Sequence, residues 1–327
     1  MNRSTPSPHV TATLDRIAGL EQPPLEKAEA LVDVATDLQK KPKTAQDLFD
    51  SLHYLDRAVS LAEAEPLALA RARAGRGSAL RQLPGSGLEV LVEARDDFSA
   101  SLSVLRDLGS EEEVAEVEMS LGLVIQTLAS AGRAPLTEAV SAYQRALRTF
   151  DAATHPREYA TIHNNLATAY LSMRLAPEKD KMREAMAVQS FQEALKVVSL
   201  DHDPVEYSML QNNLGNALQA VQSAHRLQNL SRAVEAYDEA LKVRTRHDMP
   251  VEYANTIANK ANALMNLPDD PEDATKGNPK NLSGAVDLLS EARTLFEDHG
   301  LEDRAAMVAV IIEDIGRSLP SDEGAPA

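Results

Sequence analysis

The segment Asn212–Leu218 reads NNLGNAL, and two related phrases stand elsewhere in the chain. HNNLATAYL runs from His163 to Leu171, and a more divergent ANKANALMN runs from Ala258 to Asn266. All three extend without gaps into longer segments that begin with a proline and contain Glu-Tyr: PREYATIHNNLATAYL, PVEYSMLQNNLGNALQ and PVEYANTIANKANALM. A phrase that recurs along a sequence in this way indicates an array of structural repeats.

A second phrase alternates with the first. It reads AVSAYQRAL from Ala139, AVQSFQEAL from Ala187, AVEAYDEAL from Ala233 and AVDLLSEAR from Ala285, with starts 48, 46 and 52 residues apart. Its apolar positions fall on one face of a helix, and a large side chain fills the fifth position. These large residues are Tyr143, Phe191, Tyr237 and either Leu288 or Leu289.

The first phrase also predicts a helix. Its proline suits the first helical turn, and the glutamate near it is favoured by the positive end of the helix dipole. A small residue recurs in the middle of this helix and lets a neighbouring helix approach closely. These small residues are Gly77, Gly122, Ala167, Gly215 and Ala261.

NNLGNAL followed by NLSRAVEAYDEALKV resembles the tetratricopeptide repeat (TPR), with a Leu-Gly pair in its first helix and Ala, Tyr or Phe, and Ala-Leu in its second. The long period resembles bacterial members of that family. The resemblance implies an all-α fold, a right-handed α-solenoid of about six antiparallel helix pairs with a C-terminal capping helix. We expect a TPR-like domain over 25–319, best defined over 135–299, between a flexible leader over 1–24 and a disordered tail over 320–327.

The amino-acid composition excludes several kinds of binding site and disfavours several classes of partner. The chain has no cysteine, which excludes disulfides and thiolate metal sites, and its eight histidines show no metal-binding spacing. We therefore expect no metal, no cofactor and no enzymatic activity. The formal charge of −17 argues against nucleic acid and membrane surfaces, and it favours a neutral or basic protein partner. Without a signal peptide or an apolar run near ~20 residues, a cytoplasmic protein is expected.

The TPR resemblance implies that the first helix of each pair lines a concave groove that holds the ligand. An asparagine side chain both donates and accepts hydrogen bonds, so a row of asparagines can hold the backbone of an extended peptide. Carried over residue by residue, the groove positions are Thr161, Asn164, Thr168 and Leu171, then Met209, Asn212, Asn216 and Gln219, then Asn255, Asn262, Met265 and Asn266.

Some polar residues have two interpretations. Asn165, Asn213 and Asn259 precede packed positions, so they either bond to a neighbouring helix or preceding loop or belong to the groove. Upstream, Arg71 and Arg81 either clamp a carboxylate of the partner or form a solvated face that balances nearby acids.

The leading functional hypothesis is a non-catalytic scaffold or adaptor that binds a protein segment in the groove. The alternatives are a client-specific chaperone or assembly factor and a regulatory subunit of an enzyme complex. In the last predicted helix, AAMVAVIIEDIG places apolar side chains around much of the circumference. A solenoid cap usually has a polar outer face. We therefore predict that residues 301–319 are buried further, in a homodimer or against a partner.

Overall fold

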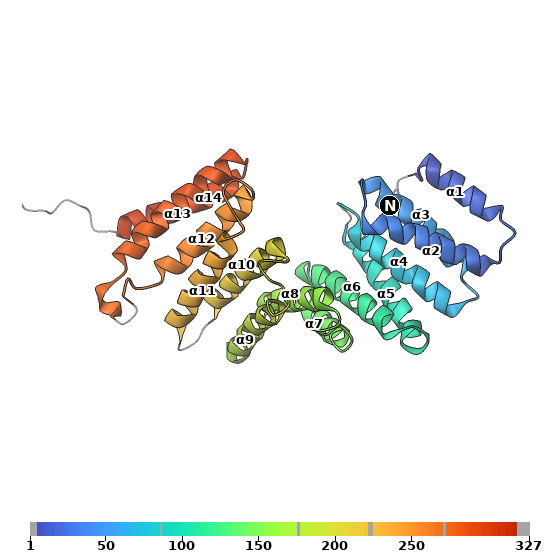
Figure 1. Cartoon of the computed structure of the whole chain (residues 1–327), viewed down its shortest axis with the longest axis horizontal. Helices are drawn as coiled ribbons and strands as arrows, with labels where there is room; N and C mark the ends of the chain where they lie inside the picture. The colour runs from blue at the N-terminus through green and yellow to red at the C-terminus, as the bar shows by residue number, and fades with distance from the viewer. Residues whose placement is uncertain (1–4, 86, 175–176, 222–224, 271–272, 319–327) are drawn as a thin grey trace, which may run out of the picture. The chain divides into compact units, whose positions relative to one another are not determined.

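The computed structural model describes residues 5–85, 87–174, 177–221, 225–270 and 273–318 (Figure 1). These residues form fourteen α-helices and one short 3-10 helix, with no strand among them, which confirms the all-α class. The chain divides into two compact units, unit 1 up to His155 and unit 2 from Pro156. The predicted tail over 320–327 lies outside the described residues.

Unit 1 consists of helix pairs preceded by one extra helix. Its helices are α1 (Pro8–Ala18), α2 (Pro24–Lys40), α3 (Ala45–Leu61), α4 (Pro66–Gln82), α5 (Leu88–Leu108), α6 (Glu111–Ser130) and α7 (Leu136–Ala146). The closest packing joins α2 to α3, α4 to α5 and α6 to α7.

Unit 2 repeats the same plan. Its helices are α8 (Pro156–Ser172), α9 (Pro177–Ala194), α10 (Pro204–Ala220), α11 (Arg226–Leu241), α12 (Pro250–Met265), the 3-10 helix η1 (Ala274–Lys276), α13 (Pro279–Asp298) and α14 (Glu302–Ser318). The pairs are α8 with α9, α10 with α11 and α12 with α13, and α14 packs on α13. The described residues thus contain three helix pairs in each unit, with a C-terminal helix after the last pair, which confirms the predicted α-solenoid fold class.

The small residues of the first helices permit close packing, as predicted. A Cβ atom built on Gly215 would stand 2.5 Å from the ring of Tyr237, and one on Gly122 would stand 2.5 Å from the ring of Tyr143. Real Cβ atoms do not approach other heavy atoms so closely. Both tyrosine side chains are fully buried. In the last repeat Leu289 takes the aromatic position and is buried, which decides between the two leucines.

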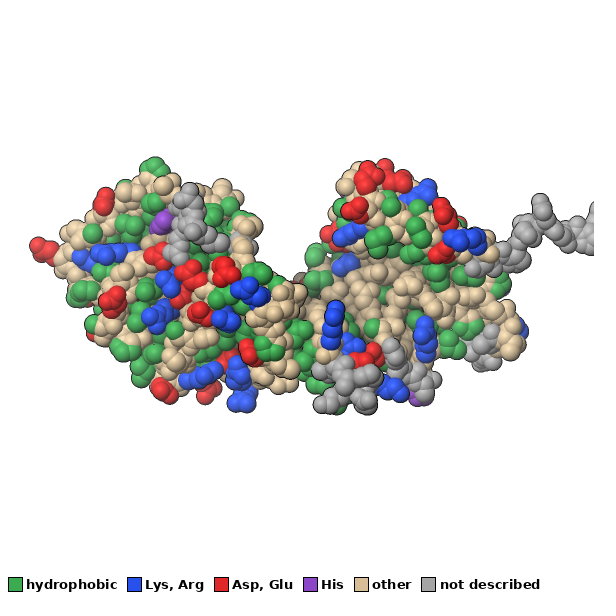
Figure 2. Space-filling view, turned by 180° about the vertical axis from the view of Figure 1, so that it is seen from behind, with side chains coloured by type: hydrophobic (Ala, Val, Ile, Leu, Met, Phe, Trp, Pro, Cys, Tyr) green, Lys and Arg blue, Asp and Glu red, His purple; other side chains and the backbone are tan. Residues whose placement is uncertain are grey.

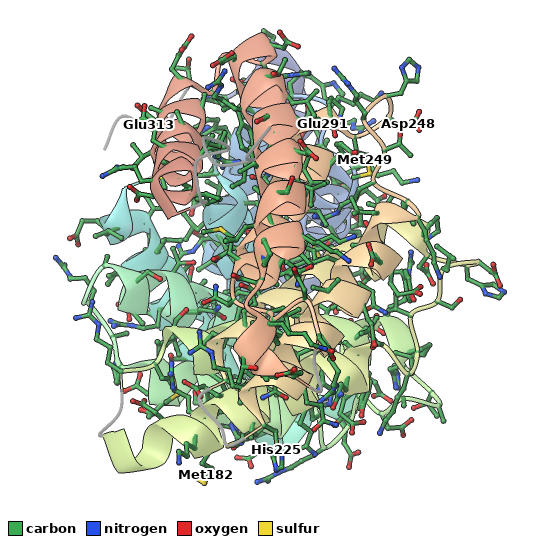
Figure 3. The ribbon with its side chains drawn as sticks, turned by 90° about the vertical axis from the view of Figure 1, so that its left-hand side faces the viewer. Met182, His225, Asp248, Met249, Glu291 and Glu313 are labelled. Carbon is green, nitrogen blue, oxygen red and sulfur yellow. The ribbon has the colours of Figure 1, made fainter. Side chains whose placement is uncertain are left out.

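The tyrosine of each Pro-x-Glu-Tyr phrase joins the two helices of its pair. Its hydroxyl donates to the glutamate of the second phrase: Tyr159 to Glu193 at 2.8 Å, Tyr207 to Glu239 at 2.9 Å and Tyr253 to Glu291 at 3.4 Å. Figure 3 shows Glu291 on the side of α13 that faces the loop of Asp248 and Met249, where it also pairs with Arg246 at 3.6 Å. Lys196 and Tyr159 together hold the pKa of Glu193 below its usual range. The repeated tyrosine therefore has a structural role.

The expected flexible leader over 1–24 contains a packed helix instead. The Ser7 side chain accepts a hydrogen bond from the backbone N–H of Val10, and Pro8 occupies the first turn of α1. Val10 and Ile17 are buried, and the Ser7 N–H donates to Asp50 of α3 at 3.2 Å. Apolar residues at helical spacing therefore attach this segment to unit 1.

The apolar residues of α14 divide between two environments. Val308 and Ile315 are buried against α12 and α13 in the core of unit 2, and Ile311 and Ile312 are partly buried there. Met307 and Val310 stay 68% and 57% exposed. Most of the apolar surface of this helix is therefore covered inside the unit.

Candidate functional site

The predicted groove residues of unit 2 lie in stripes along α8, α10 and α12. Spacings of three and four residues place each set on one side of its helix. Side-chain hydrogen bonds then join the stripes of neighbouring first helices. On the face that Figure 2 shows, the surface of unit 2 is largely uncharged between its charged helix ends and its loops, whereas charged side chains are dense on the same face of unit 1.

Asparagine side chains form a ladder between the three helices. Asn213 donates from Nδ2 to Asn164 Oδ1 at 3.5 Å, and Asn259 donates from Nδ2 to Asn212 Oδ1 at 3.3 Å. Asn212 completes the connection by donating to Asn213 Oδ1 at 3.4 Å. We call Asn164, Asn212, Asn213 and Asn259 the amide ladder. These long hydrogen bonds hold each first helix beside the next.

The ladder changes the role expected of Asn212. Its side chain is only 7% exposed, and both its amide nitrogen and its oxygen are hydrogen-bonded within the ladder. A side chain so engaged has little capacity for a ligand. Asn212 therefore belongs to the framework together with Asn213 and Asn259, two of the three residues for which a bond to a neighbouring helix was one interpretation.

Asn216 lies one turn beyond Asn212 on α10, and Asn262 lies one turn beyond Asn259 on α12. Both side chains are exposed. The buried Tyr237 hydroxyl donates to Asn216 Oδ1 at 2.7 Å, and Gln219 Nε2 donates to that hydroxyl at 2.5 Å. Burial raises the pKa of Tyr237, so the hydroxyl remains a donor. The orientation of Asn216 is thereby set, and its Nδ2 has no hydrogen-bond acceptor among the described residues.

The side chains at several other predicted groove positions form hydrogen bonds within unit 2 or are partly buried. The hydroxyls of Thr161 and Thr168 donate to carbonyls of their own helix, and both side chains are half-buried, as are Met209 and Leu171. Asn266 is exposed, donates to the Asn262 carbonyl and accepts from Arg226 at 3.3 Å.

A hollow of about 410 Å³ opens where α12, α13 and α14 meet. We call it the cap pocket. Its base is formed by the buried side chains of Leu289, Phe296 and Val308. Its other lining residues are Asn255, Ala258, Asn259, Asn262, Met265, Arg304, Met307 and Ile311. The pocket thus joins groove positions of α12 to the apolar surface of α14.

Arg304 is a site residue that sequence reasoning missed. Its Nη1 donates to Asn255 Oδ1 at 2.9 Å, and its guanidinium lies 5.9 Å from the centre of the Phe296 ring. The turn before α14 places it there, with Gly300 at a φ of 69° and the Leu301 N–H donating to the Phe296 carbonyl. Positive φ favours glycine. Arg304 lies beyond the last repeated phrase, so the repeat pattern carries no signal for it.

Arg71 and Arg81, the predicted carboxylate clamp, lie on α4 in unit 1. Arg71 is paired with Glu113 through Nε at 2.5 Å and Nη2 at 3.2 Å. Arg81 is half-buried, its Nε is enclosed without a hydrogen-bond acceptor, and burial lowers its pKa. The ion pair of Arg71 supports the second interpretation, in which the arginine balances nearby acidic residues. Neither arginine side chain extends freely towards a ligand.

Three histidines at the ends of second helices bond within their own turns. His155 contacts the Thr154 hydroxyl at 2.9 Å, His202 contacts the Ser199 hydroxyl at 3.0 Å and His299 contacts the Leu295 carbonyl at 2.9 Å. Over the described residues, three or more histidine and carboxylate side chains nowhere gather as metal ligands would. None of the helices in the described part of the chain combines the length and apolarity needed to cross a membrane.

No protein-family model matches the chain, and no curated protein matches it. A crystal structure of a Rap protein complexed with competence and sporulation factor is similar, with a TM-score of 0.34 and 14% identity over 95% of this chain and 99% of that chain. A similarity at this level assigns neither a partner nor a site.

Proposed function

We propose that this chain is a non-catalytic binding protein whose unit 2 holds an extended segment of another protein. The segment lies across α8, α10 and α12 and places an apolar side chain in the cap pocket. Asn216 and Asn262 hydrogen-bond to its backbone, which allows binding with little dependence on sequence.

The main support for the proposal is that the asparagine side chains fall into two groups. One group bonds the helices to one another, and the other is exposed at the surface. The amide ladder uses Asn212 and Asn259 to hold the helices, while Asn216 and Asn262 remain exposed one turn away. Because the Tyr237 hydroxyl already orients Asn216, little side-chain entropy is lost on binding. The adjoining cap pocket supplies apolar area that a polar surface alone would lack.

The test compares the wild-type chain with an Asn216→Ala/Asn262→Ala variant in affinity purification with quantitative mass spectrometry. Loss of two hydrogen bonds should lower the yield of the specific partner about tenfold. A Gln189→Ala/Gln192→Ala variant is the matched control, because it removes two exposed amides from the second helix α9. Equal yields of every partner from the wild type and the Asn216→Ala/Asn262→Ala variant would contradict the proposal.

We also propose that α14 forms a homodimer through the exposed Val310. This apolar side chain stands outside the cap pocket, so a second copy could cover it without filling the pocket. Light scattering at micromolar concentration should give a dimer mass for the wild type and a monomer mass for Val310→Asp. A monomer mass for the wild type would exclude this dimer.

A further inference from the structure

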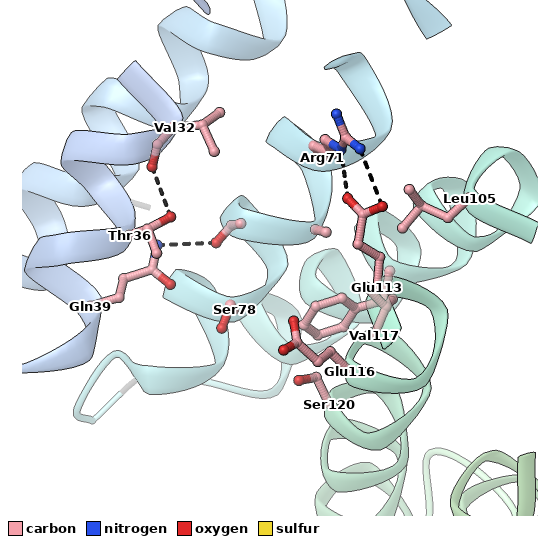
Figure 4. Close-up of a pocket in the computed structure, with 13 residues that line it drawn as sticks. Val32, Thr36, Gln39, Arg71, Ser78, Leu105, Glu113, Glu116, Val117 and Ser120 are labelled. Atoms are coloured by element: carbon pink, nitrogen blue, oxygen red, sulfur yellow. Dashed lines mark hydrogen bonds and ion pairs between the residues drawn. The ribbon is translucent and has the colours of Figure 1, made fainter. Parts of the chain in front are cut away.

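Unit 1 contains a second groove that the proposed function does not use. A hollow of about 330 Å³ lies between α2, α4 and α6 (Figure 4), and a neighbouring hollow of about 260 Å³ lies between α2 and α4. The larger hollow has apolar walls at Phe98, Leu105 and Val117. Two small residues of α4, Ala74 and Gly75, also line it.

The groove is acidic, with one guanidinium at its centre. Glu113 and Glu116 line the larger hollow, and Glu29 and Asp33 line the smaller one. Arg71 lines both, so its side chain stands where the two hollows adjoin. A groove with four carboxylates and one cation favours a positively charged occupant.

Arg71 pairs with one carboxylate and interacts electrostatically with a second. It is bound bidentately to Glu113, and Figure 4 shows both hydrogen bonds crossing from α4 to α6. It also interacts electrostatically with Glu29 of α2, on the side of the smaller hollow. The Arg71 side chain is 45% exposed, so it has space to turn. Movement from Glu113 towards Glu29 would free one carboxylate while the guanidinium keeps another nearby.

We propose that this groove is a second docking site, for a segment of a partner protein that carries an arginine or lysine beside an apolar residue. The incoming cation replaces Arg71 at Glu113, and the apolar residue packs against Phe98, Leu105 and Val117. Arg71 turns towards Glu29 and acts as a built-in competitor that any ligand has to displace. With a second segment held in unit 2, one chain can bind two partners of different chemistry.

The test measures binding of a fluorescein-labelled peptide, Gly-Leu-Arg-Arg-Leu-Gly, by fluorescence anisotropy. The wild type should bind it saturably and bind the analogue with glutamines in place of the arginines much more weakly. Glu113→Gln should weaken binding about tenfold, since a charge-assisted hydrogen bond is lost. This variant keeps the capping box that Glu113 forms with Ser110, because glutamine serves equally there.

Arg71→Gln separates this mechanism from a general loss of structure. Removal of the competitor should tighten peptide binding, whereas damage to the groove would weaken it. Glu89→Gln is the matched control, because it removes the same charge from an exposed ion pair with Arg133 in the same unit. Equal weakening by Glu89→Gln and Glu113→Gln, weaker binding to Arg71→Gln, or no saturable binding to either wild type or Arg71→Gln would overturn the proposal.

Discussion

Replacement of Gly215 by alanine is expected to lower the free energy of unfolding by about 1–3 kcal/mol, the usual cost of overpacking a dense core. The added Cβ would meet three ring atoms of Tyr237 at 2.5, 2.7 and 2.9 Å. That ring has little freedom to move, because its hydroxyl is hydrogen-bonded to Asn216 and Gln219 and its side chain is fully buried. The helices α10 and α11 would have to separate.

Urea denaturation followed by circular dichroism is the suitable measurement, because the chain has no tryptophan to report by fluorescence. Gly284→Ala on α13 is the matched control, since a Cβ built there meets nothing within 4 Å. Alanine is the better helix former, so this variant should gain up to about 1 kcal/mol. A gain in stability in both variants would show that helix propensity, rather than the contact with Tyr237, determines the effect.

Glu118→Gln is expected to destabilise unit 1 by about 3 kcal/mol, because it leaves buried ionic hydrogen bonds incomplete. Glu118 of α6 is 1% exposed. Its carboxylate accepts from Arg106 of α5 at 2.7 Å and twice from Arg145 of α7, also at 2.7 Å. One carboxylate thus joins three helices. The guanidinium groups of Arg106 and Arg145 are 51% and 37% exposed, so water can solvate them once the carboxylate is gone. The expected loss of stability is therefore at the low end of the range for breaking a buried ion pair.

The control for Glu118→Gln is again Glu89→Gln. Glu89 pairs with Arg133 at 2.9 Å, but its side chain is 75% exposed. Exposed ion pairs contribute less than about 1 kcal/mol. If the urea midpoints of the two variants fell equally, burial of Glu118 would not be the source of its contribution.

The helix pairs and their close contacts could be predicted because they depend on local periodicity. The position of Gly215 in its repeat, and of Tyr237 in the next helix, follows from the spacing of two phrases. Only a small residue fits opposite a buried ring. The same reasoning missed Pro8–Ala18, where Val10 and Ile17 form an apolar stripe outside the repeat pattern.

Within the site, periodicity placed Asn212 and Asn216 on one side of α10, but it could not distinguish them. Asn212 lies where α12 comes close enough for Asn259 to donate a hydrogen bond, so it is buried. Asn216 lies one turn beyond and stays exposed. Sequence spacing gives the direction of a side chain from its own helix, whereas burial depends on a neighbouring helix more than forty residues away.

The amino-acid sequence by itself determined the all-α class, the six helix pairs and the small residues that let them pack, since each depends on patterns within one or two helices. Only the tertiary structure decided the partners of the charged and polar side chains. It paired Arg71 with Glu113, buried Glu118 between two arginines and joined asparagines into a ladder. The physical reason is that a hydrogen bond or ion pair forms only within a few ångströms, and residues distant in sequence reach that distance only once the helices have packed.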